Sequence, residues 1–271
     1  MLAEEILSQL EIIPLDGLKA HEQTVPENIR ALKETMLNLG RLVDPLIIDK
    51  ENHIVLDGNH RRSVLEILGA DNAVCQMVDY EDKSIGVGGW YLASKIFAKS
   101  EIKGEKVDKE AGLNALQKMD AVFMHMKKNG GKEECTLVPA HAKELHHIMN
   151  EQMEFAKTQP WGKLLIEEKI NGTILFIEDD RVDFFLEKGY EVLARKIFTK
   201  KEIIAEAVAG RPLPPKSTRH QIPDRIIRLN FRLGYLNESV ENATIHLNDM
   251  VKKRVKYGSA RHYTEPVIVL Y

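Results

Sequence analysis

The feature that most constrains this chain of 271 residues is the segment at positions 57–62, which reads DGNHRR. The stretch 53–57 before it has the pattern of a strand, and the stretch after it has the apolar spacing of a helix that buries Val64, Leu65 and Leu68. A strand that turns sharply into a helix exposes the first N–H groups of that helix, and these groups favour an anion. The segment therefore predicts a phosphate-binding turn.

The residue types in this turn suit phosphate chemistry. Gly58 lets the backbone approach a ligand closely, and His60 and Arg61 offer donors that suit phosphate oxygens. Asp57 stands where a carboxylate holds Mg²⁺ against the same phosphates. The same residues also fit a plain helix cap beside solvated arginines, so the turn alone leaves both readings open.

The turn lies inside a predicted α/β domain that covers residues 1–88, with the remainder, 89–271, as a second α/β domain. Thr24 is expected to cap a helix that has Pro26 in its first turn and ends at Gly40. The other elements expected in the first domain are strands at 11–18 and 73–78, a hairpin of 45–49 with 53–57, and a helix over 59–69.

The second domain is predicted from weaker patterns. The glycines at 86–89 suggest a flexible joint, and the prolines at 211–215 suggest a stiff linker. Helices are expected at 109–128, 140–157 and 199–210, the last capped by the residues TKKE at 199–202. A strand is expected at 172–178, and a tail over 225–271 with strand-like ends around a helix.

Two further segments are candidates for chemistry. Glu22 follows His21 in a loop between a strand and a helix, and a carboxylate there can accept a proton from a hydroxyl nucleophile. The segment 216–220, KSTRH, gathers hydroxyls, a guanidinium and an imidazole that suit a carboxylate or a phosphate ester. Taken singly, each also fits a solvent-facing loop.

Composition excludes several classes of protein. Lys and Arg number 38 and Asp and Glu 41, so the net charge of −3 argues against a dedicated nucleic-acid binder. The first residues do not form a secretory signal, and no apolar run reaches the roughly 20 residues of a membrane span. Cys75 and Cys135 lack metal-type spacing, so we expect both to be reduced, as in a cytoplasmic protein. From the charge and the absence of a long apolar run, we expect neither a nucleic-acid nor a membrane partner.

Two other patterns carry little weight. The histidines at 141, 146 and 147 share no helical face and have no matching acid, so a surface position is expected rather than a metal site. The glycine run at 86–89 is too short and wrongly placed for a dinucleotide or P-loop fingerprint.

The first 80 residues resemble the ParB/sulfiredoxin superfamily, whose strand–turn–helix carries a glycine-centred motif ending in arginine. Sulfiredoxins have a reactive cysteine in this turn, whereas this chain has Asn59, so that redox chemistry is excluded. DNA-partitioning ParB proteins have a different turn and a helix-turn-helix behind it, which this chain does not clearly show. A ParB-like DNA-binding or nucleotide-switch regulator remains the alternative reading.

The free serine kinase branch is similar in three places: HE at 21–22, DGNHR at 57–61 and TRH at 218–220. Similar residues also occur at 90–91 and 199–202. The loop 216–223 resembles the archaeal ADP-dependent enzymes, while the tail, with YTE at 263–265, resembles the siderophore-linked bacterial ATP-dependent enzymes. The phosphate donor, ADP or ATP, is therefore open.

This resemblance implies an α/β (α+β) fold with a ParB/sulfiredoxin-like N-terminal lobe and a second mixed α/β lobe that forms the active-site cleft. It implies a kinase that converts L-serine to O-phospho-L-serine with ATP or ADP and Mg²⁺. By the family pattern Glu22 is the catalytic base, and Asp57 holds Mg²⁺ or orients the nucleophile. The expected phosphate-binding residues are Gly58, Asn59, His60 and Arg61, and the expected serine-binding residues are Trp90, Ser217, Thr218, Arg219 and His220.

Overall fold

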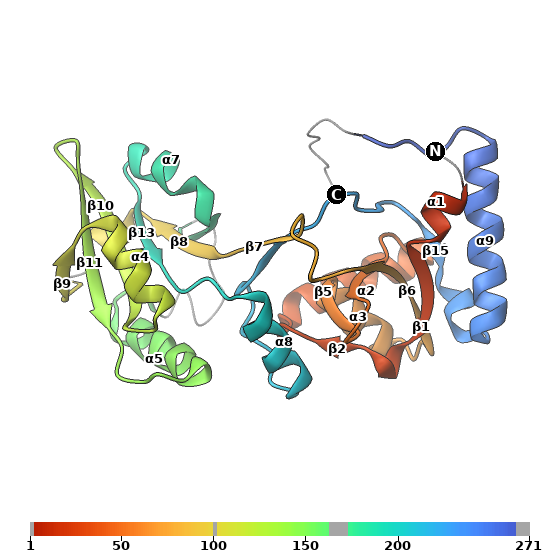
Figure 1. Ribbon diagram of the computed structural model, residues 1–271, viewed down its shortest axis with the longest axis horizontal. Helices are drawn as coiled ribbons and strands as arrows, with labels where there is room; N and C mark the ends of the chain where they lie inside the picture. The colour runs from red at the N-terminus through yellow and green to blue at the C-terminus, as the bar shows by residue number, and fades with distance from the viewer. Residues whose placement is uncertain (1–2, 100–101, 163–172, 264–271) are drawn as a thin grey trace. The chain divides into compact units, whose positions relative to one another are not determined.

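The computed structural model describes residues 3–99, 102–162 and 173–263 (Figure 1). Its helices and sheets confirm the predicted mixed α/β class. Two compact units are present, and each combines separate stretches of the chain. As far as the structure describes these stretches, the first unit takes Met1–Ile85, Ile203–Pro215 and Ile222–Tyr271, and the second takes Gly86–Glu202 and Lys216–Gln221.

The first unit is built on a five-stranded sheet in the order β1-β6-β4-β5-β2 (Figure 1). Strand β1 is antiparallel to β6, β6 is parallel to β4, and β2 is parallel to β5. The antiparallel pairing of β4 with β5 confirms the predicted hairpin, which leads directly into Asp57. The strands are β1 (Leu10–Pro14), β2 (Lys19–Ala20), β4 (Leu46–Asp49), β5 (Ile54–Asp57) and β6 (Asn72–Val78).

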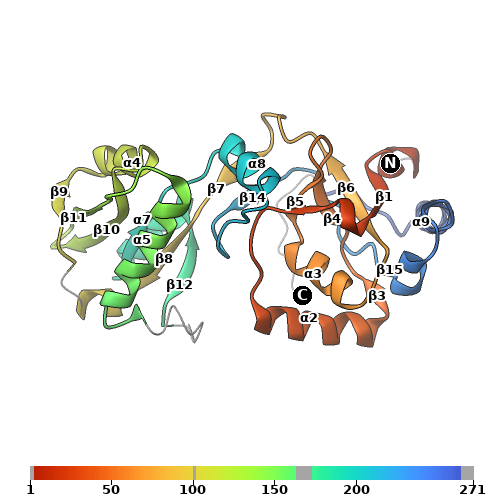
Figure 2. The same ribbon diagram turned by 90° about the horizontal axis from the view of Figure 1, so that it is seen from below.

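Two helices of this unit pack against each other, as Figure 2 shows. Helix α3 (Asn59–Ile67) follows the hairpin and buries Val64 and Leu65, as predicted, whereas Leu68 at its C-cap is only partly buried. Helix α2 (Pro26–Leu39) also forms as expected, with Pro26 in its first turn and Gly40 in the left-handed conformation at its end. The predicted cap by Thr24 is wrong, because the N-cap residue is Val25.

The C-terminal stretch completes the core of the first unit. Short strand β15 (Phe231–Arg232) pairs with β3 (Arg41–Leu42), and helix α9 (Val240–Lys256) contacts β1 and the short helix α1 (Ala3–Leu7). The apolar side chains of this stretch are buried in the same cluster as those of β1, β4 and β6. The tail therefore has its predicted helical middle and first strand-like end, while the second end lies outside the described residues.

The compact units differ from the predicted division into 1–88 and 89–271. The first boundary lies within a few residues of the observed one, but the stretches 203–215 and 222–263 belong with the first unit. Buried side chains of these stretches, such as Phe231 and Leu247, lie in the same apolar cluster as residues of β1, β4 and β6, which come far earlier in the sequence. Such long-range packing leaves no local pattern in a sequence.

The second unit contains a six-stranded antiparallel sheet in the order β12-β8-β13-β10-β11-β9. Neighbouring residues of one strand belong to different cores, since Val192 and Ala194 lie in one apolar cluster and Leu193 lies in the other. The strands are β8 (Trp90–Ser94), β9 (Glu105–Val107), β10 (Ala121–Asn129), β11 (Lys132–Pro139), β12 (Leu175–Glu178) and β13 (Glu191–Ala194).

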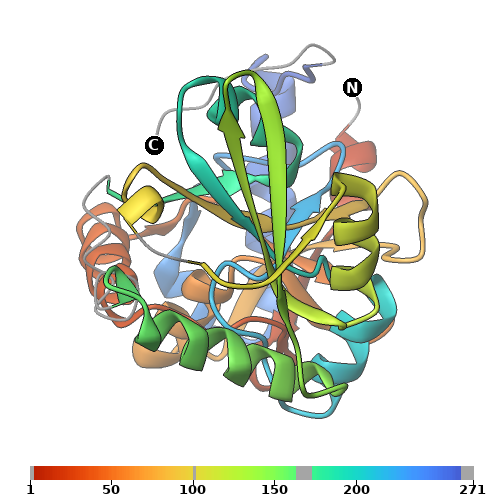
Figure 3. The same ribbon diagram turned by 90° about the vertical axis from the view of Figure 1, so that its left-hand side faces the viewer.

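Helices cover both faces of this second sheet. Helices α4 (Lys109–Gln117) and α7 (Val182–Glu187) contribute to one core cluster, and α5 (Leu145–Thr158) contributes to the other. Figure 3 faces this unit and shows α4 and α5 on different sides of the β10–β11 hairpin. A sheet that is covered on both faces carries continuous apolar strands.

That burial explains the main errors of the sequence prediction. The expected helix over 109–128 ends after Gln117, because Met119 has a positive φ of 59° and the chain then enters β10. The run 121–126 is buried throughout, so it lacks the alternation that marks a strand. The helix expected from 140 begins at Leu145, and the strand expected from 172 begins at Leu175, residue 172 lying outside the described residues.

The chain passes between the units through short segments. Strand β7 (Gly86–Gly88) occupies most of the predicted joint and pairs antiparallel with β14 (Arg219–Gln221). Helix α8 (Lys200–Val208) is preceded by a reciprocal cap, in which Thr199 N donates to Glu202 and Glu202 N donates to Thr199 Oγ1, as the sequence predicted.

Among the described residues, each helix is too short or too polar to cross a membrane.

Candidate active site

The turn between β5 and α3 has a conformation that requires glycine. Gly58 is the N-cap residue of α3, with a φ of 103° that side-chain-bearing residues rarely adopt. A Cβ atom at this position would lie 2.7 Å from Leu46 Cδ2 and 3.0 Å from Arg61 Nε. The side chains of Leu46 and Arg61 therefore pack directly against the backbone of Gly58. The first N–H groups of α3, which follow this turn, have no partner within the helix.

Arg61 braces the turn from within the same unit. Its Nη2 donates to Asp57 Oδ2 at 3.0 Å, and its Nη1 donates to the carbonyl of Pro45 at 2.9 Å. Only 16% of the Arg61 side chain is exposed. Arg61, which was predicted to bind an anion, thus also holds Asp57 in place, four residues earlier in the chain.

His60 and Arg62 bind neighbouring parts of the protein. His60 Nε2 accepts a hydrogen bond from the backbone N–H of Val25 at 3.0 Å, so in this arrangement Nδ1 carries the ring proton. This bond satisfies the N–H of Val25, the N-cap residue of α2. Arg62 donates to the carbonyl of Leu18 and pairs with Glu66 at 2.7 Å, so its side chain serves the structure of α3.

The side chain of Asn59 lies beneath the turn. It is 8% exposed, and its Nδ2 lies 2.9 Å from Nδ1 of His21, which is itself 2% exposed. The same His21 nitrogen forms a short hydrogen bond with the carbonyl of Val55 on strand β5. Asn59 thus links the turn to the loop that carries Glu22, and as the first residue of α3 it has a backbone N–H without a partner inside the helix.

The loop that carries Glu22 is fixed on both sides by backbone hydrogen bonds. Leu213 N donates to the carbonyl of His21 at 2.8 Å, and Gln23 N donates to the carbonyl of Leu213 at 2.7 Å. The segment predicted to be a stiff linker is therefore a strand-like partner of the loop, bridged in parallel with Glu22. Leu213 is fully buried. As an apolar residue between prolines, it was the local feature of the sequence that could have indicated that this segment packs against the protein.

A neutral imidazole adjoins the carboxylate of Glu22. His21 Nε2 lies 3.6 Å from Glu22 Oε2, and burial lowers the pKa of His21 to about 4. At neutral pH this contact therefore joins a neutral imidazole to the carboxylate of Glu22. A carboxylate can accept a proton from a hydroxyl nucleophile.

In the second unit, Trp90 is held by the predicted serine-binding loop. Its Nε1 donates to the carbonyl of Thr218 at 2.9 Å, and Lys216 Nζ lies 4.9 Å from the centre of its ring. Arg195 donates both to the carbonyl of Trp90, at 3.0 Å, and to the carbonyl of Lys216. Ser217 is 2% exposed, so these contacts anchor a buried loop.

Arg219 lies among carboxylates. Its Nη2 is 3.2 Å from Glu178, and its Nη1 is 3.2 Å from Asp180 and 4.0 Å from Asp179. His220 follows it in β14, paired with Val87 of β7. The sequence prediction missed these acidic partners, which form the run EDD at 178–180 at the end of β12 and just after it.

The structure thus brings the predicted residues together in two groups. The first unit contains the acid and the turn, and the second contains the tryptophan and the polar loop. The first group is Glu22, Asp57, Gly58, Asn59, His60 and Arg61, and the second is Trp90, Ser217, Thr218, Arg219 and His220.

The turn offers one carboxylate to a magnesium ion. Asp57 Oδ2 accepts hydrogen bonds from Arg61 and from Arg225, so its charge is already balanced in part. Mg²⁺ commonly takes one or two carboxylates and completes its shell with waters and substrate phosphates. The turn therefore fits a magnesium ion that would take one protein ligand from Asp57 and most of its other ligands from nucleotide phosphates and water.

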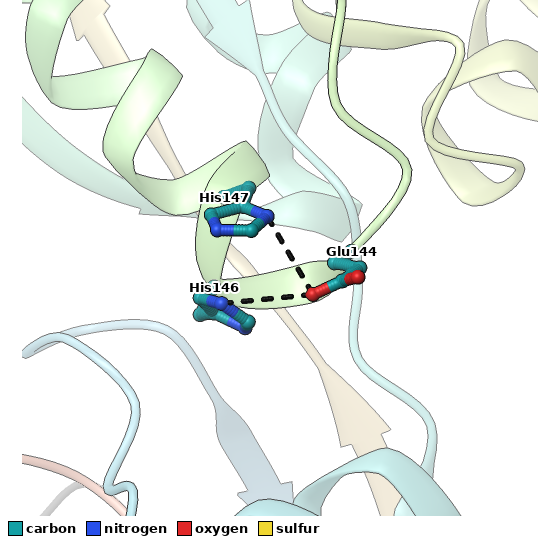
Figure 4. Close-up of side chains that lie close together, drawn as sticks. All are labelled: Glu144, His146 and His147. Atoms are coloured by element: carbon teal, nitrogen blue, oxygen red, sulfur yellow. Dashed lines mark ion pairs between the residues drawn. The ribbon is translucent and has the colours of Figure 1, made fainter.

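Three metal-type side chains meet elsewhere in the second unit, at the start of α5 (Figure 4). Glu144 Oε2 lies 3.7 Å from His146 Nε2 and 3.5 Å from His147 Nδ1. The expectation that these histidines lack a matching acid is therefore wrong, since Glu144 supplies one. All three are substantially exposed, and structural zinc sites use four ligands, so a solvated ion-pair cluster accounts for the group.

The chain is similar to curated L-serine kinases over most of its length. It is 28% identical over 233 residues to the ADP-dependent L-serine kinase of Thermococcus kodakarensis, covering 83% of this chain and 91% of the relative. It is 26% identical over 227 residues to the ATP-dependent L-serine kinase of Staphylothermus marinus, covering 78% and 85%. A ParB-like protein of Sulfolobus acidocaldarius is 31% identical over 86 residues, 30% of this chain and 41% of the relative.

Solved structures support the same fold. A free serine kinase in complex with AMP has a TM-score of 0.63 at 22% identity, covering 84% of this chain and 93% of that one. A C-terminally truncated SbnI from Staphylococcus aureus also has a TM-score of 0.63, at 18% identity, covering 95% of this chain and 100% of that one. No family model matches the chain. The relatives confirm the predicted resemblance to the free serine kinase family.

Substitution of Gly58 by alanine tests the conformation of the turn. Gly40 also has a positive φ, of 62°, but has open space around it, whereas a Cβ at Gly58 meets Leu46 and Arg61. We expect Gly40→Ala to lower the free energy of unfolding by about 1–2 kcal/mol, from backbone strain alone. Gly58→Ala should cost roughly 1 kcal/mol more, from crowding. Equal losses in urea unfolding would show that the turn has another conformation.

The buried His21 should make stability depend on pH. Its pKa is about 4 in the folded protein and about 6.5 when unfolded, so between these values only the unfolded chain binds the proton. The stabilising contribution is therefore complete above pH 6.5 and is lost as the pH falls towards 4. Between pH 7 and pH 4.5, the wild type should lose about 2–3 kcal/mol more unfolding free energy than His21→Gln.

Urea unfolding at both pH values provides this measurement. His262→Gln changes an exposed histidine and should keep the wild-type pH dependence. If His21→Gln also keeps it, His21 is not buried in neutral form.

Proposed function

We propose that this chain acts as the free serine kinases that it resembles do, and transfers a phosphoryl group from a nucleotide to the hydroxyl of free L-serine. The serine oxygen forms a bond to the terminal phosphorus, and the bond from that phosphorus to the rest of the nucleotide breaks. The hydroxyl proton passes to a carboxylate of the protein. The products are O-phospho-L-serine and a nucleotide that has one phosphate fewer.

The observation that carries this proposal is the fixed attachment of the Glu22 loop to the anion-binding turn. His21 bonds to Val55 and adjoins Asn59, and Val25 bonds to His60, so the loop is tied to the turn on both sides of Glu22. Phosphoryl transfer to a hydroxyl needs a phosphate-binding element and a nearby proton acceptor. A carboxylate held at a fixed distance from helix N–H groups supplies both.

On the donor side, the backbone of Gly58 and the start of α3 would bind the transferred phosphate, together with Arg61 and the Nδ1–H of His60. Asn59 would act through its backbone N–H, because its side chain is buried against His21. Mg²⁺ would neutralise charge on the nucleotide phosphates, with Asp57 as its protein ligand. Positioning and charge neutralisation then supply most of the catalysis.

On the acceptor side, the second unit would bind serine. Arg219 would take the carboxylate, exchanging contacts with its acidic neighbours, and these acids would favour the ammonium group of the amino acid. Trp90 would wall the pocket, and the loop of Ser217, Thr218 and His220 would contact serine or its phosphate ester. The bond from Trp90 to the carbonyl of Thr218 keeps wall and loop together.

Product formation tests this proposal directly. The purified chain is incubated with L-serine, Mg²⁺ and either ADP or ATP, and ³¹P NMR follows the phosphate monoester. We expect O-phosphoserine with at least one nucleotide, and D-serine serves as the control acceptor. Absence of product with both nucleotides contradicts the proposal, and DNA retardation that weakens steeply with salt would then favour the ParB-like alternative.

Replacement of Glu22 should separate chemistry from nucleotide binding. We expect Glu22→Gln to lower kcat by about 100- to 10,000-fold, the usual contribution of a general base, while the Kd of the nucleotide stays near the wild-type value. The matched control is Glu27→Gln, an exposed residue in the first turn of α2. A kcat within a few-fold of wild type would remove Glu22 from the role of base.

Replacement of Arg219 should act on serine. Loss of one charge-assisted hydrogen-bonding group costs about 1.5–3 kcal/mol, so Arg219→Ala should raise the KM for serine by roughly 10- to 100-fold. The KM for the nucleotide should change little. Arg181→Ala, which removes an arginine stacked on Phe184 in the same unit, is the control. An unchanged serine KM would show that serine binds elsewhere.

A further inference from the structure

A second arginine reaches the phosphate-binding turn from the far end of the sequence. Arg225 Nη2 donates to Asp57 Oδ2, the same oxygen that accepts from Arg61. Arg225 belongs to the stretch 222–263 that packs with the first unit, 168 residues along the chain from Asp57. Two guanidinium groups therefore converge on the first residue of the turn.

The backbone on both sides of Arg225 is held by one buried side chain. Gln76 of β6 is 1% exposed, and its Nε2 donates to the carbonyl of Asp224 at 2.9 Å. Its Oε1 accepts from the N–H of Ile226, also at 2.9 Å. One amide thus uses its donor and its acceptor on the two neighbours of Arg225. This clamp gives the backbone of Arg225 a defined position relative to the sheet that ends at Asp57.

The two arginines differ in their exposure. Arg61 is 16% exposed, and its Nη1 is bonded to the carbonyl of Pro45. The side chain of Arg225 is 41% exposed, so it is more accessible to solvent than that of Arg61. A planar guanidinium can donate to a carboxylate from one nitrogen and to a phosphate oxygen from another. Arg225 has the geometry of such a bridging group, whereas Arg61 is mainly a brace.

We infer that Arg225 is a donor-phosphate ligand of this site, and that Gln76 is the positioning residue that presents it. This inference rests on the proposed nucleotide-dependent function. Asp57 orients the guanidinium, and the outward N–H groups bind an oxygen of the nucleotide phosphates at the start of α3. The charge of Arg225 also offsets the charge that accumulates on these oxygens during transfer.

Nucleotide binding tests the inference with Arg225→Gln and Arg225→Lys. Titration calorimetry with ADP and with ATP should show a Kd raised by about 10- to 100-fold in Arg225→Gln, the effect of losing a charged hydrogen-bond donor. Arg225→Lys should recover part of this loss, because it keeps the charge without the planar fork. The KM for serine should stay within about three-fold of wild type, since serine is assigned to other residues.

Two controls separate this role from a structural one. Arg232→Gln removes an exposed arginine from the same stretch and should leave nucleotide binding unchanged. Gln76→Leu removes both arms of the clamp, and it should raise the nucleotide Kd in the same direction as Arg225→Gln. Because Gln76 is buried, circular dichroism and thermal unfolding establish first that this variant is folded; if it is not, the Arg225 variants decide the question.

The outcomes distinguish this inference from the proposed function. Wild-type nucleotide affinity in Arg225→Gln overturns the inference, even if the wild-type chain makes O-phosphoserine. A nucleotide affinity that depends on Arg225, in a wild-type chain that forms no O-phosphoserine, upholds the inference and overturns the kinase. Failure of the wild-type chain to bind either nucleotide contradicts both.

Discussion

The buried contact of His21 with Val55 and Asn59 is the interaction on which the rest of the site depends. It joins the loop before α2 to the strand and the helix that enclose the turn. Burial keeps the imidazole neutral at pH 7, and the same side chain lies 3.6 Å from the carboxylate of Glu22. A mobile loop would place a carboxylate near the turn only part of the time, and the rate of a positioned reaction falls steeply with misplacement.

Late segments of the chain complete this arrangement. Leu213 supplies the strand-like partner of the Glu22 loop, and Arg225 adds a second guanidinium at Asp57. Both belong to stretches that return to the first unit after the second unit has been formed. Gln76 uses a buried amide to hold one of these returning stretches, which is an effective use of a polar group because both of its hydrogen-bonding capacities are satisfied.

The second unit has a different kind of organisation. Its polar loop is anchored through backbone carbonyls, since Trp90 and Arg195 donate to the carbonyls of Thr218 and Lys216. These contacts fix the course of the loop. The acidic run around Arg219 means that a serine carboxylate would have to exchange with existing ion pairs, which allows selection of a ligand that also carries a positive charge.

Prediction from the sequence succeeded where the determinants are local. The hairpin, helix α3 and the cap of α8 follow from turn residues, apolar spacing and capping chemistry within a few positions. It failed for β10, which is buried on both faces and reads as a helix. It also missed Leu213, Arg225 and Glu144, because their partners are set by tertiary packing or by side-chain direction.

The same limit applies to roles within the turn. The sequence identified the DGNHR segment, but only the structure shows that Asn59 turns inward to His21 and that His60 accepts from Val25. A sequence motif indicates which residues are candidates to bind a phosphate. It does not indicate which of their atoms already form hydrogen bonds within the protein. The predicted cleft between two lobes stays a prediction.

The central claim is that nucleotide phosphates bind at the start of α3, beside a fixed Glu22 loop. Amide NMR spectra of the ¹⁵N-labelled chain, recorded during titration with ADP, test it most directly. We expect the largest changes in chemical shift at the amides of residues 58–61, with smaller changes at 22–25 and 224–226. Shifts confined to other parts of the chain, with these amides unmoved at saturation, would contradict it.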